Sequence, residues 1–429
     1  MGRLARWYRT VTVPYPRAVR RLAIPLAMAL LLPGCGLFGP AANENERTVL
    51  VDYHYDQFAD MFAFYFPHQL TARQGDTVVF KQAWNGEAHT VTFGTALDTI
   101  GKPVWDYIDK DTQPPPDVLG ATAQAADAVI PFMVGQQDLK VRQNGAEPCY
   151  LDSGTPPTDP NTPCPKRPQP AFTGLQAFYS SGFIPYQGTD HDNTFRVPIS
   201  SDAKPGTYHY ICLFHGPGMN GTLTIVPKNA AIPSQAEVNR KAQAEVDQIA
   251  KPLGTAFSQG KQGHYPVKLV APYKFVIAGY ADPTQHSQHG FGSVSEFLPK
   301  TIDIKVGETL HWLVVGDLHN VAFDVPPYFP EFTVKKDGTV EWNPQAVGPV
   351  ASPSLGQSPF QGPGSGQLPA EIVPQITDGG NYDGSHFISS GLGGGGPADI
   401  GYSLTFTKIG TYKYACLIHP AMVGTVIVH

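Results

Sequence analysis

Two stretches of the chain decide its fold: GTYHYICLFH at residues 206–215 and GTYKYACLIH at residues 410–419. Aromatic and β-branched residues dominate both stretches, which is typical of β-strands. Because alternate residues of a strand share a face, Tyr208 and Tyr210 are expected on the same face as Cys212. Each stretch ends in Cys-x-x-His, so each predicted strand carries two metal-ligating side chains at its end.

The two stretches belong to a longer internal repeat. Three further pairs of blocks occur in the same order: 75–80 with 307–312, 89–93 with 319–323, and 219–222 with 422–425. Four matched blocks in one order indicate a duplication, in which each copy is one structural unit. Between the blocks each copy holds a long insertion rich in Gly, Pro and Ser, at about 95–195 and 325–400. A loop of this length with little regular structure of its own is usually functional or disordered.

The composition is that of a β protein. The 429 residues include 44 glycines and 42 prolines, too many for a helical bundle. The formal net charge of −6 argues against a nucleic-acid-binding protein, since such proteins have a basic surface. We therefore predict an all-β fold with this organisation: a signal peptide at 1–34, a tether at 35–47, a first domain at 48–227, a linker with one helix at 228–264 and a second domain at 265–429.

The linker has a clear helix signal. Ser234 to Glu237 form a capping-box pattern. Apolar residues then recur at helical spacing, namely Val238, Ala242, Val246, Ile249 and Ala250. We expect the helix to end at Pro252 and Gly254.

Each copy offers one upstream histidine, then Cys-x-x-His, then a methionine. The candidate ligands are His89, Cys212, His215 and Met219 in the first copy, and His319, Cys416, His419 and Met422 in the second. One thiolate, two imidazoles and a weak thioether suit copper, which cycles between a soft and a harder ion. Zinc sites rarely use a thioether, and hard cations prefer oxygen ligands.

Both copies resemble the cupredoxin family, of the plastocyanin, pseudoazurin and amicyanin kind. Residues 414–422 look most like amicyanin, with two residues between His419 and Met422, whereas three residues separate His215 from Met219. In the first copy Thr90 also stands where the second has Asn320. The resemblance implies two Greek-key β-sandwiches, each with a type 1 (blue) copper at one end.

The resemblance also implies electron transfer without a substrate. His215 and His419 would present an imidazole edge through apolar surface formed by Phe214, Pro217, Ile418 and Pro420. There a redox partner, such as a cytochrome or a membrane oxidase or reductase complex, would dock.

Two alternatives stay open. A copper oxidase or nitrite reductase would need a second kind of metal site, for which His209, His286 and His289 are the visible candidates. A copper carrier would need exposed Met or His clusters, and the chain has six methionines in all.

The N-terminus reads as a targeting segment. Residues 1–34 contain six arginines and no acidic residue, and an apolar run covers 22–32. The run ends in Leu-Pro-Gly before Cys35, which resembles a bacterial lipobox, so Cys35 would be the lipidated first residue of a mature, membrane-anchored, extracytoplasmic chain. An ordinary secretory signal or a twin-arginine signal at Arg20 and Arg21 is the alternative.

Two cysteines are left over after these roles. Cys149 and Cys164 lie in the first insertion. In an oxidising compartment we expect them to form a disulfide, although two free thiols are the alternative.

Overall fold

The computed structural model describes the chain from residue 44 to residue 429, with gaps. The described residues are 44–53, 55, 60–82, 88–118, 121, 143–152, 169–184, 193–264, 274–281, 287–314, 318–325, 332–334, 340–343, 375–391, 393, 400–419 and 421–429. The expected signal peptide, the tether up to residue 43 and Cys35 therefore lie outside the described part. In the part that is described, no helix is both long and apolar enough to span a membrane.

The first half of the chain forms two sheets, as the sequence predicts. One sheet has the strand order β3-β1-β5-β9, with bounds Tyr65–Phe66, Glu46–Val51, Thr77–Lys81 and Thr194–Pro198. The other has the order β4-β11-β10-β6-β8-β7, with bounds Gln69–Arg73, Gly216–Val226, Gly206–Cys212, Thr92–Phe93, Phe178–Ser180 and Cys149–Leu151. The stretch at 206–215 thus supplies β10, which pairs with β11 along its whole length.

The second half repeats both strand orders. Its first sheet contains β13-β12-β15-β21, with bounds Phe291–Leu298, Lys274–Ala281, Thr309–Val314 and Ile400–Phe406. Its second sheet is β14-β23-β22-β16-β20, with bounds Thr301–Ile304, Val423–Val428, Gly410–Ala415, Ala322–Phe323 and Ile388–Ser389. Equivalent strands occupy equivalent places in the two halves, so the fold reproduces the duplication seen in the sequence. The chain is mostly β, and each half is a sandwich-like body of two sheets.

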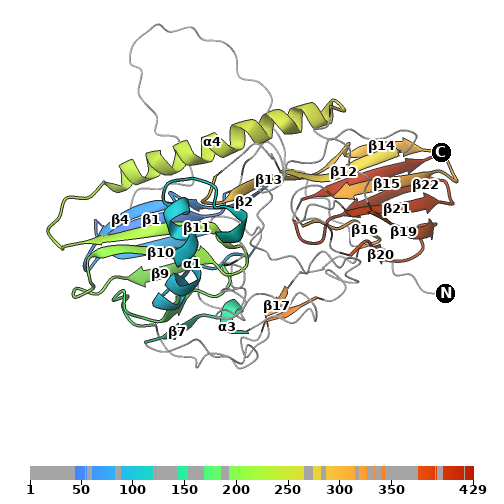
Figure 1. Ribbon diagram of the computed structural model, residues 1–429. Coiled ribbons are helices and arrows are strands. Elements are labelled where there is room, and N and C mark those ends of the chain that lie inside the picture. The colour runs from blue at the N-terminus through green and yellow to red at the C-terminus, as the bar shows by residue number, and fades with distance from the viewer. Residues whose placement is uncertain are drawn as a thin grey trace, which may run out of the picture. The chain divides into compact units, whose positions relative to one another are not determined.

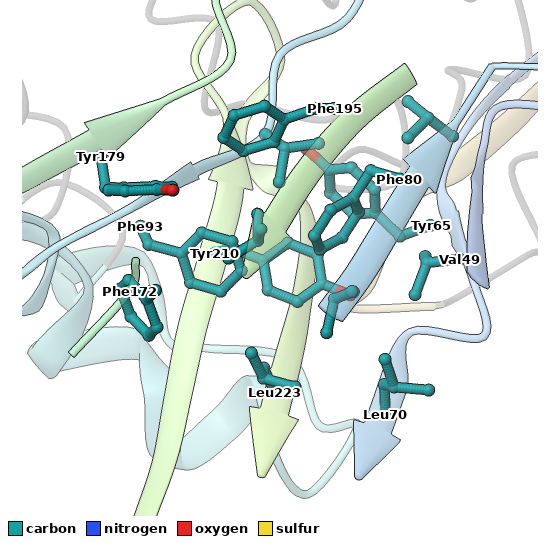
Figure 2. Packing of buried hydrophobic residues seen from close by; sticks show 14 of the residues in the cluster. Val49, Tyr65, Leu70, Phe80, Phe93, Phe172, Tyr179, Phe195, Tyr210 and Leu223 are labelled. Atoms are coloured by element: carbon teal, nitrogen blue, oxygen red, sulfur yellow. The ribbon is translucent and has the colours of Figure 1, made fainter. Parts of the chain in front are cut away.

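Aromatic side chains fill the first core, and Figure 2 shows Tyr65, Phe80, Phe93 and Tyr210 packed together. The ring centroids of Tyr65 and Tyr210 lie 4.9 Å apart, and those of Phe80 and Tyr210 lie 5.1 Å apart. Tyr210 and Cys212 belong to one cluster of buried residues, which confirms the shared face predicted from alternation. Burial of each such ring stabilises the fold by roughly 1.5–3 kcal/mol.

The long helix α4 (Gln235–Lys261) confirms the predicted linker helix (Figure 1). Ser234 and Glu237 form both bonds of the capping box, and the five predicted stripe residues are buried. The predicted end at Pro252 and Gly254 is wrong, because the helix continues to Lys261. Burial of Leu253 and Gly260 offsets the hydrogen bond lost at the proline.

Gly260 has a packing role at this end of α4. A β-carbon there would lie 2.7 Å from Cδ1 of Leu298 on β13, so a larger residue would require the Leu298 side chain to shift.

The insertions contain more regular structure than expected. In the first, α1 (Thr95–Ile108) and the short α3 (Gln143–Ala146) accompany β7 and β8. Leu97, Trp105 and Ile108 of α1 join a small apolar cluster with Ile211 and Leu213, beside the cysteine of β10. In the second, β19 (Gln375–Tyr382) pairs with β21, and β17 (Phe332–Val334) pairs with β18 (Val340–Trp342). The prediction that these segments have little structure is therefore wrong for the described parts.

One strand of the first half belongs to a sheet of the second half. β2 (Asp60–Ala63) pairs antiparallel with β13, and Ala63 lies opposite Phe291. Helix α4 contacts β13 of the second half and β1 and β3 of the first. The two copies are thus joined by backbone hydrogen bonds as well as by the linker.

Candidate metal centres

The first group of ligands gathers at one end of the first sandwich. His89 lies between β5 and β6, Cys212 ends β10, and His215 lies in the turn that leads into β11. Nδ1 of His89 lies 3.3 Å from Nδ1 of His215, and Sγ of Cys212 lies 3.5 Å from the same nitrogen of His215. The three ligand atoms all lie within 4.8 Å of one another.

The second group has the same composition. His319, Cys416 and His419 bring one nitrogen, one sulfur and one nitrogen within 4.8 Å of one another. Sγ of Cys416 lies 3.7 Å from Nδ1 of His419, and the two imidazole centroids are 4.6 Å apart. These are the only two such groups of His, Cys, Asp and Glu among the described residues.

The methionines are placed with their own groups. Met219 lies on β11 in the buried cluster that contains Cys212, and Met422 lies in the cluster that contains Cys416. Both methionine side chains are fully buried. The backbone N–H of Cys416 donates to the carbonyl of Met422 at 3.0 Å, which ties the two ligand-bearing positions together.

The residue after each upstream histidine holds the cysteine loop. Thr90 Oγ1 accepts the backbone N–H of Leu213 at 2.7 Å. Asn320 Oδ1 accepts the backbone N–H of Leu417 at 2.6 Å. Thr90 and Asn320 therefore make equivalent hydrogen bonds in the two copies, although their side chains differ.

A serine from each insertion accepts a backbone hydrogen bond from the segment that follows the upstream histidine. Ser181 Oγ accepts the N–H of Val91 at 2.8 Å, and Ser390 Oγ accepts the N–H of Val321 at 2.9 Å. The glycines that follow, Gly182 and Gly391, both have a positive φ, which glycine adopts without strain. The repeated Ser-Ser-Gly sequence of the insertions is thus part of the support of each site.

Sequence reasoning missed one buried carboxylate at the first group. Asp52 is fully buried, and its Oδ2 lies 2.9 Å from Nε2 of His89. Its Oδ1 accepts the backbone N–H groups of Tyr53 and Phe62 at 2.6 and 2.9 Å. No motif in the sequence marks Asp52, and only the folded chain brings it onto His89.

The electrostatics of the first group follow from these contacts. Burial alone would lower the pKa of His89, but the hydrogen bond with Asp52, helped by Cys212, raises it to about 9. Burial raises the pKa of the Cys212 thiol, but the charges and hydrogen bonds of His215 and His89 outweigh this and lower it to about 5. The cysteine is thereby held as the thiolate that a metal requires.

The second group is electrostatically different. Burial, followed by the charge of His419, lowers the pKa of His319 well below its usual value. Neither ring nitrogen of His319 has a hydrogen-bond partner among the described residues. Burial raises the pKa of the Cys416 thiol, but hydrogen bonds and the charge of His419 outweigh it and lower this pKa as well.

Both groups fit a copper ion. A buried imidazole with two unsatisfied nitrogens is costly unless an ion or another partner binds it, and His319 is such a group. Two imidazoles, a thiolate and a buried thioether are the donors of a type 1 copper site. His89, Cys212, His215 and Met219 would hold one ion, and His319, Cys416, His419 and Met422 the other.

The expected apolar docking surface is wrong for the second copy. His419 is 2% exposed and Ile418 is 6% exposed. The buried cluster that contains Ile418 includes Ala88 and Phe183 of the first half, so first-half residues contribute to the cover of this ligand loop. Pro420 lies outside the described residues. In the first copy Pro217 is buried, while Phe214 and His215 are half-buried.

Two histidines considered for a further metal site have other contacts. His209 stacks on Trp105 with centroids 4.3 Å apart and lies 3.0 Å from Asp109. His289 stacks on His68, and its Nδ1 lies 3.0 Å from Oδ1 of Asn220. The third, His286, lies outside the described residues.

The expected disulfide is described on one side only. Cys149 is disulfide-bonded. Among the described cysteines, Cys212 and Cys416 are free, so the partner of Cys149 lies outside the described residues. Cys164 itself lies there, and the pairing of these two residues stays a prediction.

Comparison with known proteins points to copper for the second half. Residues 288–429, about a third of the chain, match the family of copper binding proteins described as plastocyanin/azurin. No curated protein sequence matches the chain significantly.

Solved structures of amicyanin resemble part of the chain. A mutant with Cu(I) is 17% identical, covers 38% of this chain and 87% of its own, and has a TM-score of 0.19. The amicyanin of Paracoccus versutus (Thiobacillus versutus) is 18% identical, covers 38% of this chain and 86% of its own, and has a TM-score of 0.16.

Proposed function

We propose that this protein is an electron carrier with two type 1 copper sites in one chain. The observation that carries the proposal is the duplicated His-Cys-His group, in which every ligand atom lies within 4.8 Å of the others. A buried methionine accompanies each group. The plastocyanin/azurin match covers the second group and supports copper as its metal.

The ligand set suits one-electron transfer. A bound copper would supply a one-electron couple, taking an electron from a donor protein and passing it to an acceptor. Ligands tied to the backbone, as Cys212 is through Thr90 and Leu213, move little when the charge of the site changes. His215 is the more exposed of the two downstream histidines, and we assign electron entry to it.

The proposed partners are redox proteins, such as a cytochrome or a membrane oxidase or reductase complex. Encounters of this kind use small, weak interfaces. We further propose that the carrier works outside the cytoplasm, attached to a bacterial membrane through a lipid on Cys35. The arginine-rich start and the lipobox-like sequence before Cys35 support this part of the proposal.

Copper counting with single-site variants tests the function. Purified protein should bind two copper ions and show the strong visible band of a Cu(II)–thiolate bond. Cys212→Ser should remove one centre and Cys416→Ser the other, and each should leave about half of the band. The double variant should be colourless. A single copper, with the band intact after Cys212→Ser, would refute two sites.

A further inference from the structure

The two metal centres differ at one structurally equivalent position. Strand β1 runs parallel to β5 with Arg47 opposite Val78, and β12 runs parallel to β15 with Lys274 opposite Leu310. Val78 and Leu310 are equivalent in the repeat, so Asp52 occupies the place of Gly279. Their φ angles are 63° and 79°, so the backbone has the same left-handed conformation at both.

The residue at this position determines which group contacts Nε2 of the upstream histidine. In the first centre the Asp52 carboxylate lies 2.9 Å from Nε2 of His89. In the second centre a β-carbon at Gly279 would lie only 1.9 Å from Nε2 of His319, so no side chain fits there. The ring of His89 therefore has the carboxylate of Asp52 beside it, whereas the ring of His319 has only the backbone of Gly279 beside it.

The carboxylate fixes the tautomer of His89. An ionised carboxylate only accepts hydrogen bonds, so Nε2 must carry a proton and donate it. In the neutral ring this leaves the lone pair on Nδ1, the atom that faces His215. Partners of this kind orient metal-ligating histidines and make them more basic.

The carboxylate also acts on the charge of the site. Asp52 and His89 are both fully buried, where water screens their interaction little. A negative charge on the far side of the imidazole favours the divalent ion over the monovalent one. The equivalent position of the second centre has no such charge.

We propose that Asp52 is a positioning residue that holds His89 ready for the metal and gives the first centre a lower reduction potential than the second. This inference rests on the proposed copper sites. A chain that carries one electron then holds it on the second centre: the first is oxidised, the second is reduced, and one electron moves without a proton or a new bond. Electrons accepted at the first centre thus run towards the second.

Reduction potentials of isolated centres provide the test. Cys416→Ser leaves the first centre alone, and Cys212→Ser leaves the second, so the two potentials can be compared directly. Asp52→Gly then gives the first centre the residue of the second. We expect a 10- to 100-fold loss of Cu(II) affinity with little change for Cu(I), which corresponds to a rise of about 60 to 120 mV.

Two further variants separate the contact with His89 from the support of the backbone. Asp52→Asn keeps an oxygen for the N–H groups of Tyr53 and Phe62, but it places an amide NH2 opposite Nε2 of His89 and so removes both the charge and the acceptor of the Nε2 proton. We expect the potential of the first centre to rise, whereas a role limited to holding the two backbone N–H groups would leave it unchanged. Asp76→Asn is the matched control, because Asp76 is a buried carboxylate that precedes β5, at the opposite end of these parallel strands from Asp52. It should leave the potential unchanged.

A metal-free measurement gives an independent readout. In the metal-free protein, the Nε2 proton of His89 should be observable by NMR and protected from exchange, and Asp52→Gly should remove this protection. Unchanged potentials in Asp52→Gly and Asp52→Asn, with two coppers bound in the parent protein, would overturn this inference alone. A parent protein that binds no copper would overturn the proposed function together with it.

Discussion

Thr90 and Asn320 lie next to the upstream histidines, and they show how different residues can hold equivalent loops. Each side-chain oxygen accepts one backbone N–H just beyond the cysteine. The N–H of Leu213 is buried, and an unsatisfied buried donor costs about 1–3 kcal/mol. The oxygen is therefore the required feature at this position, and both side chains provide it.

The free thiol of the first centre should be unusually acidic in the metal-free protein. With Cys416→Ser and without residues 1–35, the ultraviolet absorbance of the thiolate should appear with a midpoint pKa of about 5, well below the ~8.5 of an ordinary cysteine. The cause is the pair of histidines, which outweighs the effect of burial.

The pH dependence of stability should follow from the same groups. The lowered pKa of Cys212 stabilises the fold fully above the unfolded thiol pKa, and this stabilisation is lost as the pH falls through about 5. The raised pKa of His89 acts in the opposite sense: its contribution is full below the unfolded value and lost as the pH rises through about 9. A thiolate midpoint at the ordinary cysteine value would contradict the statement about Cys212.

Single residues were predictable from the sequence where a motif names them. The Cys-x-x-His stretches and the duplicated upstream histidines identify six side chains that the structure brings into two groups. Asp52 was not predictable in this way, because it has no motif of its own. Its role depends on a left-handed backbone position that brings a carboxylate onto the ring of a residue 37 positions away.

At the scale of elements, helix α4 depends on the cap at its start. Ser234→Ala should lower the free energy of unfolding by about 1 kcal/mol, because the serine oxygen accepts the N–H of Glu237. Thr255→Ala, at an exposed position inside the helix, is the control and should be neutral or slightly stabilising. Urea unfolding of both variants measures the difference, and equal effects would show that the cap is unimportant.

The cap should also weaken in acid. Hydrogen bonds from the backbone and side chain of Ser234 lower the pKa of Glu237. The contribution of Glu237 is therefore present above its unfolded pKa and lost as the pH falls through the folded value. Ser234→Ala should accordingly differ least from the parent protein at low pH.

Local signals predicted the strands and the start of α4, but not where α4 ends. Pro252 is a strong stop signal in an isolated helix. Here the apolar face continues past it, and Leu253 is fully buried. Helix α1 was missed for a related reason, since its sequence contains Gly101 and Pro103 and is held by contacts such as that of Trp105 with His209.

At the scale of the whole molecule, we predict that the protein is attached to a membrane. The mature chain should begin at a lipidated Cys35 and partition into detergent, because the lipobox-like sequence directs cleavage and acylation there. Cys35→Ala should release the protein into the soluble fraction with its copper retained. Intact-mass analysis that finds another N-terminus and no acyl group would show the prediction to be wrong.

The repeat predicted two similar bodies but not their connections. Matched blocks reveal strands that pair within a copy, since both partners recur in each half. The pairing of β2 with β13 has no counterpart in the repeat and involves only four residues of the first half. The packing of Ala88 and Phe183 in the cluster around the second centre is equally invisible in the sequence.

Because β2 of the first copy pairs in a sheet of the second copy, neither copy can be removed without disturbing the other. In a simple tandem protein, loss of one copy leaves the other intact. Here, removal of the first copy would take away β2 and leave β13 with an unpaired edge, and such edges invite association with other chains. Removal of the second copy would leave Met61 and Phe62, both now fully buried, without the sheet that they join. Each copy therefore supplies part of the packing of the other.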